Sequence, residues 1–185
     1  MAQTIRVGII GCGSVMQGPY MSLAEKLQCR GELEVAVACD VRPELETVVK
    51  NQLGIPRFTT DYNDVIHDKE LDAILVLTSM NEHAALAKAS LNAGKHTLVE
   101  KPMAVNLTDA RDLIETAQST GKTLICAPHV IHSPTYRRIW EHITRDHIGT
   151  VNLARARYGW SGPDWGPWFY KPGAVPCLTW AFTTL

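Results

Sequence analysis

Short runs of apolar residues recur along this 185-residue chain, and they constrain its fold more than any other feature. The runs are Ile5–Ile10, Leu33–Cys39, Ala73–Leu77, a run that begins at Thr97, and Thr123–Ala127. A strand with one face in water alternates apolar and polar residues, whereas a strand covered on both faces is apolar throughout. The runs therefore predict the strands of a parallel sheet with both faces covered.

Segments with helical signals lie between and after these strands. They are Pro43–Leu53 before Gly54, Ala84–Leu91 before Gly94, the stretch from Asn106 to Gly121, and Thr135–Asp146 before Gly149. Strands that alternate with helices and connect by right-handed crossovers form a doubly wound sheet. We therefore expect an α/β fold of the Rossmann type.

The character of the sequence changes after about Pro128, where charged and aromatic residues increase. Residues Val151–Tyr158 alternate in places like a strand with one exposed face. We expect a domain boundary between residues 122 and 128. The two parts should pack together, because no linker rich in serine and glycine separates them.

Composition argues against several classes of function. The formal net charge is −1, so the chain lacks the basic excess of a general nucleic-acid or anionic-membrane binder. Its five cysteines are odd in number and form no CxxC pair, which predicts free thiols in a reducing compartment. The N-terminus does not have the pattern of a signal peptide, and no apolar run reaches the ~18 residues of a membrane span. We expect a cytoplasmic protein.

A glycine motif follows the first predicted strand. Gly11 and Gly13, with Ser14 and Val15 after them, stand where a strand is expected to turn into a helix. Glycine in that position lets backbone N–H groups approach a pyrophosphate. Met16 replaces the third small residue of the usual pattern, and a plain tight turn is the alternative interpretation. The motif predicts a dinucleotide site.

Asp40 ends the second predicted strand, where an acidic side chain can accept hydrogen bonds from the ribose hydroxyls of an adenosine. Its charge repels a 2′-phosphate and favours NAD over NADP. Arg42 can pair with such a phosphate, so NADP stays open as a cofactor. The alternatives are that Asp40 caps the helix after it and that Arg42 is a solvated charge.

Glu100, Lys101 and Pro102 follow the run that begins at Thr97. The carboxyl ends of strands face the ligand crevice in open α/β sheets. Neighbouring strand residues point to opposite sides, so Glu100 and Lys101 would not both face one pocket in a regular strand. A lysine beside a nicotinamide can orient a hydroxyl or relay its proton, which makes Lys101 the candidate catalytic residue.

Together, four features resemble the Gfo/Idh/MocA family of oxidoreductases, which includes glucose–fructose oxidoreductase and inositol dehydrogenase. The features are GIIGCG, the Asp40 strand end, TSMNEHAALAKASLNAGKHTLVEKPMAVN and SPTYRRIWEHITRDHIGTV, and the resemblance covers residues 4–172. It implies that Gly11 and Gly13 hold the pyrophosphate and that Asp40 holds the ribose. The other residues that it implies for the cofactor cleft are Thr78, Asn81, His83, Glu100 and Lys101.

The resemblance also implies three segments. Residues 1–124 are the dinucleotide-binding domain, 125–173 begin an α+β open-sheet domain for substrate and oligomerisation, and 174–185 depart from the family. With a suitable choice of codons, a reading frame shifted by two bases turns the last segment into GPLFDMGVYNL, which is similar to the family's continuation. We hypothesise that this tail is a frameshifted reading of a longer gene, so that the chain is incomplete and weakly active or inactive.

The expected function is hydride transfer between a nicotinamide cofactor, NAD, and a sugar, polyol or related secondary alcohol. A non-catalytic dinucleotide-binding module or regulator, and an NAD-dependent glycosidase of the same family, are the alternatives. Neither a nucleic acid nor a membrane is expected as a partner. The oligomeric state is left open, with a homo-oligomer as one alternative. His129 and His132 would face opposite sides of an extended segment without a further ligand at suitable spacing, so no metal is expected.

Overall fold

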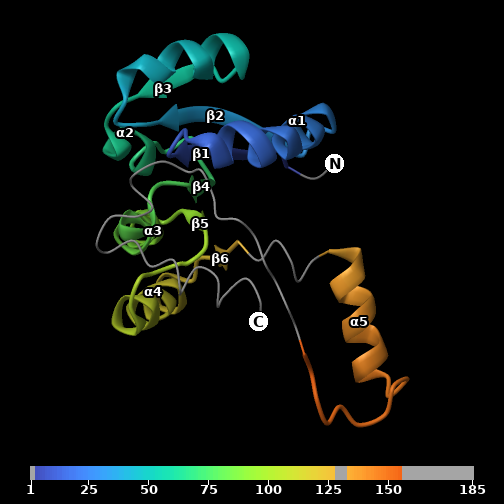
Figure 1. The fold of residues 1–185 in the computed structure, drawn as a ribbon. Coiled ribbons are helices and arrows are strands. Elements are labelled where there is room, and N and C mark those ends of the chain that lie inside the picture. The colour runs from blue at the N-terminus through green and yellow to red at the C-terminus, as the bar shows by residue number, and fades with distance from the viewer. Residues whose placement is uncertain (1–2, 128–132, 156–185) are drawn as a thin grey trace. The chain divides into compact units, whose positions relative to one another are not determined.

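The computed structural model of the chain describes residues 3–127 and 133–155. It divides into two compact units after Cys126. The first unit is built on one six-stranded sheet, and the second contains a single helix in its described part (Figure 1). The tail at 174–185 and the two histidines at 129 and 132 lie outside the described residues.

The strands of the sheet are β1 (Ile5–Ile10), β2 (Leu33–Cys39), β3 (Arg57–Thr59), β4 (Ala73–Val76), β5 (His96–Val99) and β6 (Leu124–Cys126). The helices are η1 (Met16–Tyr20), α1 (Met21–Cys29), η2 (Pro43–Leu45), η3 (Val48–Gln52), α2 (Tyr62–Ile66), η4 (Met80–Glu82), α3 (His83–Asn92), α4 (Leu107–Thr120) and α5 (Pro134–Thr144). Residues 14–29 and 43–52 are each helical without a break.

All strand pairings in the sheet are parallel, and the strand order is β3-β2-β1-β4-β5-β6. From β1 the chain builds outward through β2 to β3, then returns to place β4 on the other side of β1. This is the order of the Rossmann fold, and the crevice beside its reversal point is where such sheets bind ligands. The predicted fold class is confirmed.

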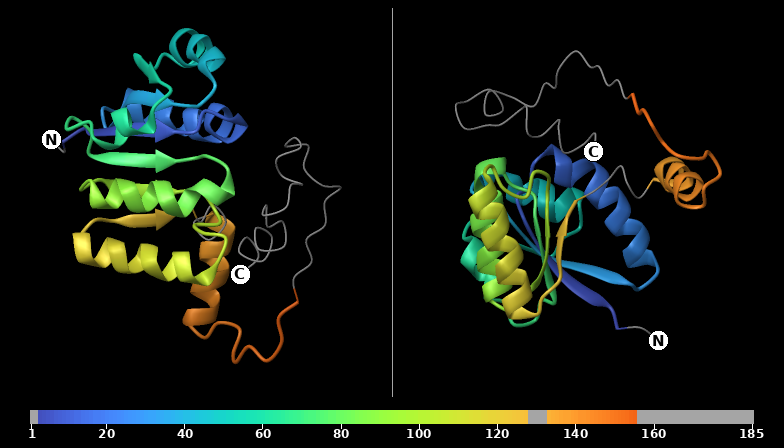
Figure 2. Two further views of the ribbon diagram at one scale, coloured as in Figure 1. Left: turned by 90° about the vertical axis from the view of Figure 1, so that its left-hand side faces the viewer. Right: turned by 90° about the horizontal axis from the view of Figure 1, so that it is seen from below.

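Helices cover both faces of the sheet, as Figure 2 shows. Apolar side chains from α2, α3 and α4 pack on one face around Ile74, Val76 and Val99. Side chains from the 14–29 helical run and from η3 pack on the other face around Val7 and Ile9. Burial on both faces explains why the strand sequences are apolar with so little alternation.

The predicted helix after Asn106 is α4, and its ends have the expected chemistry. The Asn106 side chain accepts a hydrogen bond from the Asp109 backbone N–H at 2.9 Å. Gly121 ends the helix with φ +66°, a conformation in which other residues are strained. Such end signals made this element predictable from sequence.

Three features of the fold differ from the expectations. The short strand β3 and helix α2 were not predicted, because neither has a run long enough to show a period. The helix expected over Pro43–Leu53 is present, but as 3₁₀ and π turns around a short α-helical step. The strand expected over Val151–Tyr158 was wrong for residues 151–155, which pair with no strand in the described chain. A strand needs a partner for its backbone hydrogen bonds, and alternation alone does not supply one.

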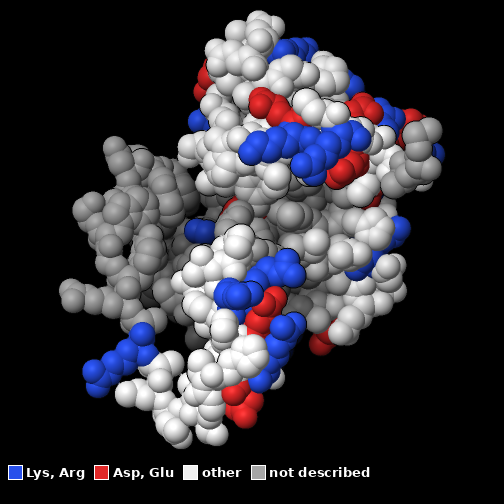
Figure 3. Space-filling model, turned by 90° about the vertical axis from the view of Figure 1, so that its right-hand side faces the viewer, with Lys and Arg blue, Asp and Glu red and all other residues white. Residues whose placement is uncertain are grey.

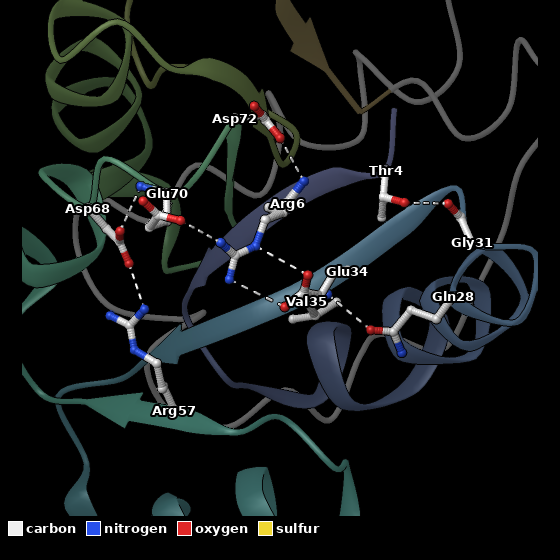
Figure 4. A network of polar contacts seen from close by, with 10 residues as sticks. All are labelled: Thr4, Arg6, Gln28, Gly31, Glu34, Val35, Arg57, Asp68, Glu70 and Asp72. Atoms are coloured by element: carbon white, nitrogen blue, oxygen red, sulfur yellow. Dashed lines mark hydrogen bonds and ion pairs between the residues drawn. The ribbon is translucent and has the colours of Figure 1, made fainter. Parts of the chain in front are cut away.

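Arg6 organises a polar network at the amino edge of the sheet (Figure 4). Its guanidinium pairs with Glu34 of β2 at 3.2 Å and with Glu70 at 3.0 Å. Its backbone N–H donates to the Asp72 carboxylate at 2.8 Å. These contacts join β1 to β2 and to the loop before β4. They lie at the end of the sheet opposite to the predicted site.

Basic and acidic side chains alternate on the face drawn in Figure 3, which fits the near-zero net charge. Among the described residues, no helix is both long enough and apolar enough to cross a membrane.

Candidate functional site

The predicted site residues follow four neighbouring strands. Gly11 follows β1, Asp40 follows β2, Thr78 follows β4 after one residue, and Glu100 follows β5. Because these strands are parallel and adjacent, their carboxyl ends lie at one edge of the sheet. The fold therefore brings the four loops together there.

Gly11 packs against the loop after β4 so closely that only glycine fits. Its φ is +100°, and a Cβ would lie 2.6 Å from the Leu77 carbonyl carbon and oxygen and 2.7 Å from the Thr78 nitrogen. The Gly11 N–H donates to the Cys39 carbonyl at 2.8 Å. Gly11 thus joins the loops after β1, β2 and β4.

Gly13 differs from Gly11, because a Cβ there would meet no atom within 4 Å. Packing inside the described chain does not require glycine at this position. Ser14 and Val15 follow it as exposed residues at the beginning of the helical run 14–29. The first N–H groups of a helix have no partner within the helix and attract anions. The loop leaves open space beside a helix N-terminus.

Two side chains hold the loop in this shape. Asp40 accepts a hydrogen bond from the Cys12 N–H at 2.8 Å. Gln17 donates from Nε2 to the Cys12 carbonyl at 2.7 Å, and its backbone N–H donates to the Gly13 carbonyl at 3.0 Å. The peptide groups on both sides of Cys12 are therefore fixed. Sequence reasoning missed Gln17, which has no recognisable spacing from the glycines.

Met16 stands where the usual motif has its third small residue. It is fully buried and begins the π-helical turn η1. Pro19 lies inside that turn and has no backbone N–H, which interrupts the regular helical ladder. The wider turn therefore coincides with a large residue and a proline, two features that the sequence displayed but whose effect was not predicted.

Asp40 is 9% exposed and pairs with Arg42. Its Oδ1 accepts from the Arg42 backbone N–H at 3.0 Å and from Arg42 Nε at 3.1 Å. Burial raises the pKa of this carboxyl, but the hydrogen bonds from Arg42 and Cys12 outweigh that effect and lower the pKa below its ordinary value. Asp40 is therefore an ionised group that tethers the glycine loop.

Cys12 lies between the two glycines but is not a nucleophile. Burial, with the Asp40 charge nearby, raises the pKa of its thiol to about 12. The thiol donates to the Cys39 carbonyl at 3.4 Å. It stays protonated at neutral pH and acts as a packing residue.

His83 connects the loops after β4 and β5. Its ring is 1% exposed, with Nδ1 2.7 Å from the Pro102 carbonyl oxygen and Nε2 3.0 Å from the Thr78 carbonyl oxygen. Both ring nitrogens thus face backbone acceptors. His83 thus links the backbone at Thr78 to the backbone at Pro102, whereas Asn81 is exposed on η4.

Glu100 and Lys101 lie just beyond β5, so the strict alternation of a strand does not apply to them. The Glu100 side chain is buried, and Lys101 is half-buried. Glu100 Oε2 accepts from the Lys101 backbone N–H at 2.9 Å, and Oε1 accepts from the Tyr20 hydroxyl at 3.0 Å. Tyr20 was not among the predicted site residues.

Residues 3–127 and 133–155 contain no group of three or more histidine, cysteine or acidic side chains placed to hold a metal ion. The polar groups that the structure places at the carboxyl edge are backbone amides, the carboxylates of Asp40 and Glu100, and the side chains of Arg42, Tyr20, His83 and Lys101.

Comparison with known proteins relates this chain to one family of oxidoreductases. The model of the Gfo/Idh/MocA family, described as an oxidoreductase family with an NAD-binding Rossmann fold, matches residues 5–127. Inositol 2-dehydrogenase of Salmonella typhimurium is 31% identical over 123 residues, which are 66% of this chain and 36% of that protein. Myo-inositol 2-dehydrogenase of Thermotoga maritima is 28% identical over 151 residues, 82% of this chain and 44% of that protein.

Solved structures share the fold. A probable dehydrogenase from Thermotoga maritima has a TM-score of 0.70 at 28% identity, covering 78% of this chain and 42% of that one. Scyllo-inositol dehydrogenase of Lactobacillus casei, solved with NAD(H) and scyllo-inositol, has a TM-score of 0.73 at 22% identity, covering 80% and 43%. The chain thus spans less than half the length of these relatives.

The two glycines should respond in opposite ways to the same substitution. Gly11→Ala places a Cβ into backbone at a strained φ and should lower the free energy of unfolding by about 2 kcal/mol or more. Gly13→Ala should leave it within about 0.5 kcal/mol. Urea unfolding of both variants measures this. Equal losses would contradict the assignment of Gly11 as the packing glycine and Gly13 as the open one.

Asp40 should contribute a pH-dependent part of the stability. A carboxyl with a lowered pKa stabilises the fold at pH values above its ordinary pKa of 3.8, and this contribution disappears as the pH falls through the lowered value. Asp40→Asn should therefore lower the free energy of unfolding by about 1–3 kcal/mol at neutral pH. On acidification below about pH 5, the free energy of unfolding of this variant should fall less than that of the wild type.

Urea unfolding at a series of pH values tests this. Asp112→Asn, which removes an exposed ion pair with Lys88, is the matched control and should change little. A pH profile of Asp40→Asn parallel to that of the wild type would contradict the role given to Asp40.

Proposed function

The chain belongs to the Gfo/Idh/MocA oxidoreductase family, and from that premise we propose that its first domain binds NAD along the carboxyl edge of the sheet. The observation that carries the proposal is the place of Gly13, where open space meets the N-terminus of the 14–29 helical run at the carboxyl edge. A Cβ at Gly13 would meet no atom within 4 Å, so the backbone there is open to a ligand. A pyrophosphate can approach the backbone N–H groups at such a position.

Asp40 supports the choice of NAD. In this proposal its carboxylate accepts hydrogen bonds from the ribose hydroxyls and disfavours a 2′-phosphate. Arg42 already pairs with Asp40, and half of its side chain is exposed. That pairing offsets part of the negative charge of Asp40, and it lessens but does not remove the repulsion of a 2′-phosphate. We therefore propose NAD as the preferred cofactor and NADP as the weaker one.

Lys101 is the proposed catalytic residue. NAD, when bound, supplies the hydride acceptor, and the lysine would orient the substrate hydroxyl and take up or relay its proton. Its backbone is held on one side by Glu100, and the next residue's carbonyl is held by His83. Both anchors limit the movement of the segment that carries the Lys101 side chain.

The proposed substrate is a sugar, polyol or related secondary alcohol. The support is the family and the relatives named as inositol dehydrogenases. We place the dinucleotide-binding domain at 1–124 and the beginning of a substrate and oligomerisation domain at 125–173. A dinucleotide-binding module without turnover is the second candidate, since the open backbone at Gly13 supports cofactor binding and does not by itself require turnover.

Titration of the full chain with NADH, followed by nicotinamide fluorescence, tests the cofactor proposal. The wild type should bind, and Gly13→Ala should weaken binding by about tenfold or more, since the added Cβ keeps the charged pyrophosphate from the backbone N–H groups. Gly18→Ala, also at a position with open space, is the matched control and should bind as the wild type does. No binding by the wild type would contradict the proposal.

Formation of NADH from NAD and a panel of polyols then separates the two candidates. Turnover that Lys101→Met abolishes, with NADH affinity kept, supports the oxidoreductase. Binding without turnover supports the module.

A further inference from the structure

Tyr20 contacts the carboxyl edge of the sheet through Glu100, and the proposed function does not use it. It ends η1, and its ring packs on the core face of the sheet with Met16 and Leu77 in the same cluster. Its hydroxyl donates to Glu100 Oε1 at 3.0 Å. The two residues are 80 positions apart in sequence, so the contact depends wholly on the fold.

The contact spans the reversal point of the sheet. Tyr20 belongs to the helical run that follows β1, and Glu100 follows β5. β4 lies between β1 and β5 in the sheet, so the two ends are about 10 Å apart at the usual strand spacing. The tyrosine side chain therefore reaches past the end of β4. This is the edge at which open α/β sheets hold their ligands.

The Glu100 carboxylate is engaged at both oxygens. One accepts from Tyr20, and the other accepts from the Lys101 backbone N–H at 2.9 Å. The Glu100 side chain is 7% exposed, so these bonds form away from water, where an unsatisfied carboxylate oxygen is costly. The hydroxyl of Tyr20 thus fixes the Glu100 carboxylate, which in turn holds the backbone N–H of Lys101.

Tyr20 also stays in its donor form. Burial, reinforced by the negative charge of Glu100, raises the pKa of the Tyr20 hydroxyl well above its ordinary value. The hydroxyl therefore stays protonated at neutral pH and keeps donating to the carboxylate.

We propose that Tyr20 is a positioning residue for the nicotinamide half of the cofactor site, acting through Glu100 on the backbone of Lys101. The inference rests on the proposed function, because it needs NAD at this edge. It predicts a division of labour along the edge. Gly13 and Asp40 serve the pyrophosphate and adenosine side, and the Tyr20–Glu100 pair serves the nicotinamide side.

Two ligands that share one half of their structure test this division. ADP-ribose contains the adenosine and pyrophosphate of NADH but lacks the nicotinamide. Tyr20→Phe keeps the ring and removes one hydrogen bond, so it should weaken NADH binding by about five- to tenfold. ADP-ribose affinity should change less than about twofold, since its contacts lie on the other side. Tyr62→Phe, at an exposed tyrosine on α2, is the matched control and should change neither affinity.

A double-mutant cycle tests whether Tyr20 acts through Glu100. Adding Tyr20→Phe to Glu100→Gln should weaken NADH binding by much less than it does in the wild type, because the carboxylate that it positions is already altered. Additive effects would overturn the proposed route. The fluorescence emission of NADH bound to Tyr20→Phe should also shift, since the nicotinamide ring would lie in a less rigid environment.

The outcomes are distinguishable. If the wild type binds neither NADH nor ADP-ribose, the proposed function fails and this inference fails with it. If the wild type binds both and Tyr20→Phe binds NADH as tightly, only this inference is overturned. Equal weakening of NADH and ADP-ribose would also overturn it, because it would show a general structural role.

Discussion

The close approach of Gly11 to the Leu77–Thr78 peptide sets the geometry of the whole carboxyl edge. A side chain at Gly11 would overlap that peptide, so the loops after β1 and β4 can meet only with glycine there. Asp40 then anchors the same loop to the end of β2 through the Cys12 N–H. With the backbone fixed on both sides, Gly13 is left beside open space. The open backbone of the site thus results from tight packing at Gly11 and the lack of a neighbouring atom at the Cβ position of Gly13.

Much of the fold could be predicted from sequence, because many of its strands and helices depend on residues that are close together in the chain. Apolar runs gave β1, β2 and β4, and the Asn106 and Gly121 signals gave α4, because each depends on neighbouring residues. Gly11, Gly13 and Asp40 were found by their positions at strand ends. By contrast, β3 has three residues and no visible period. The alternation after Val151 predicted a strand that residues 151–155 do not form, because no described strand pairs with them.

The contacts that complete the site could not be predicted in this way. Tyr20 meets Glu100, and His83 meets Pro102, only because β1, β4 and β5 are adjacent in the sheet. Strand order is a global property that no local pattern encodes. These two contacts join loops that follow different strands, as do the contacts of the predicted residues Gly11 and Asp40. The Arg6 network lies at the opposite edge of the sheet.

Amide NMR of the full chain tests the proposed placement of a dinucleotide on the backbone at Gly13. On addition of NADH, the amide signals of Gly13, Ser14 and Val15 should shift, together with that of Lys101. Signals of Arg6 and Glu34, at the opposite edge, should stay unchanged. Shifts confined to residues away from the glycine loop, or no shifts at all, would contradict this placement.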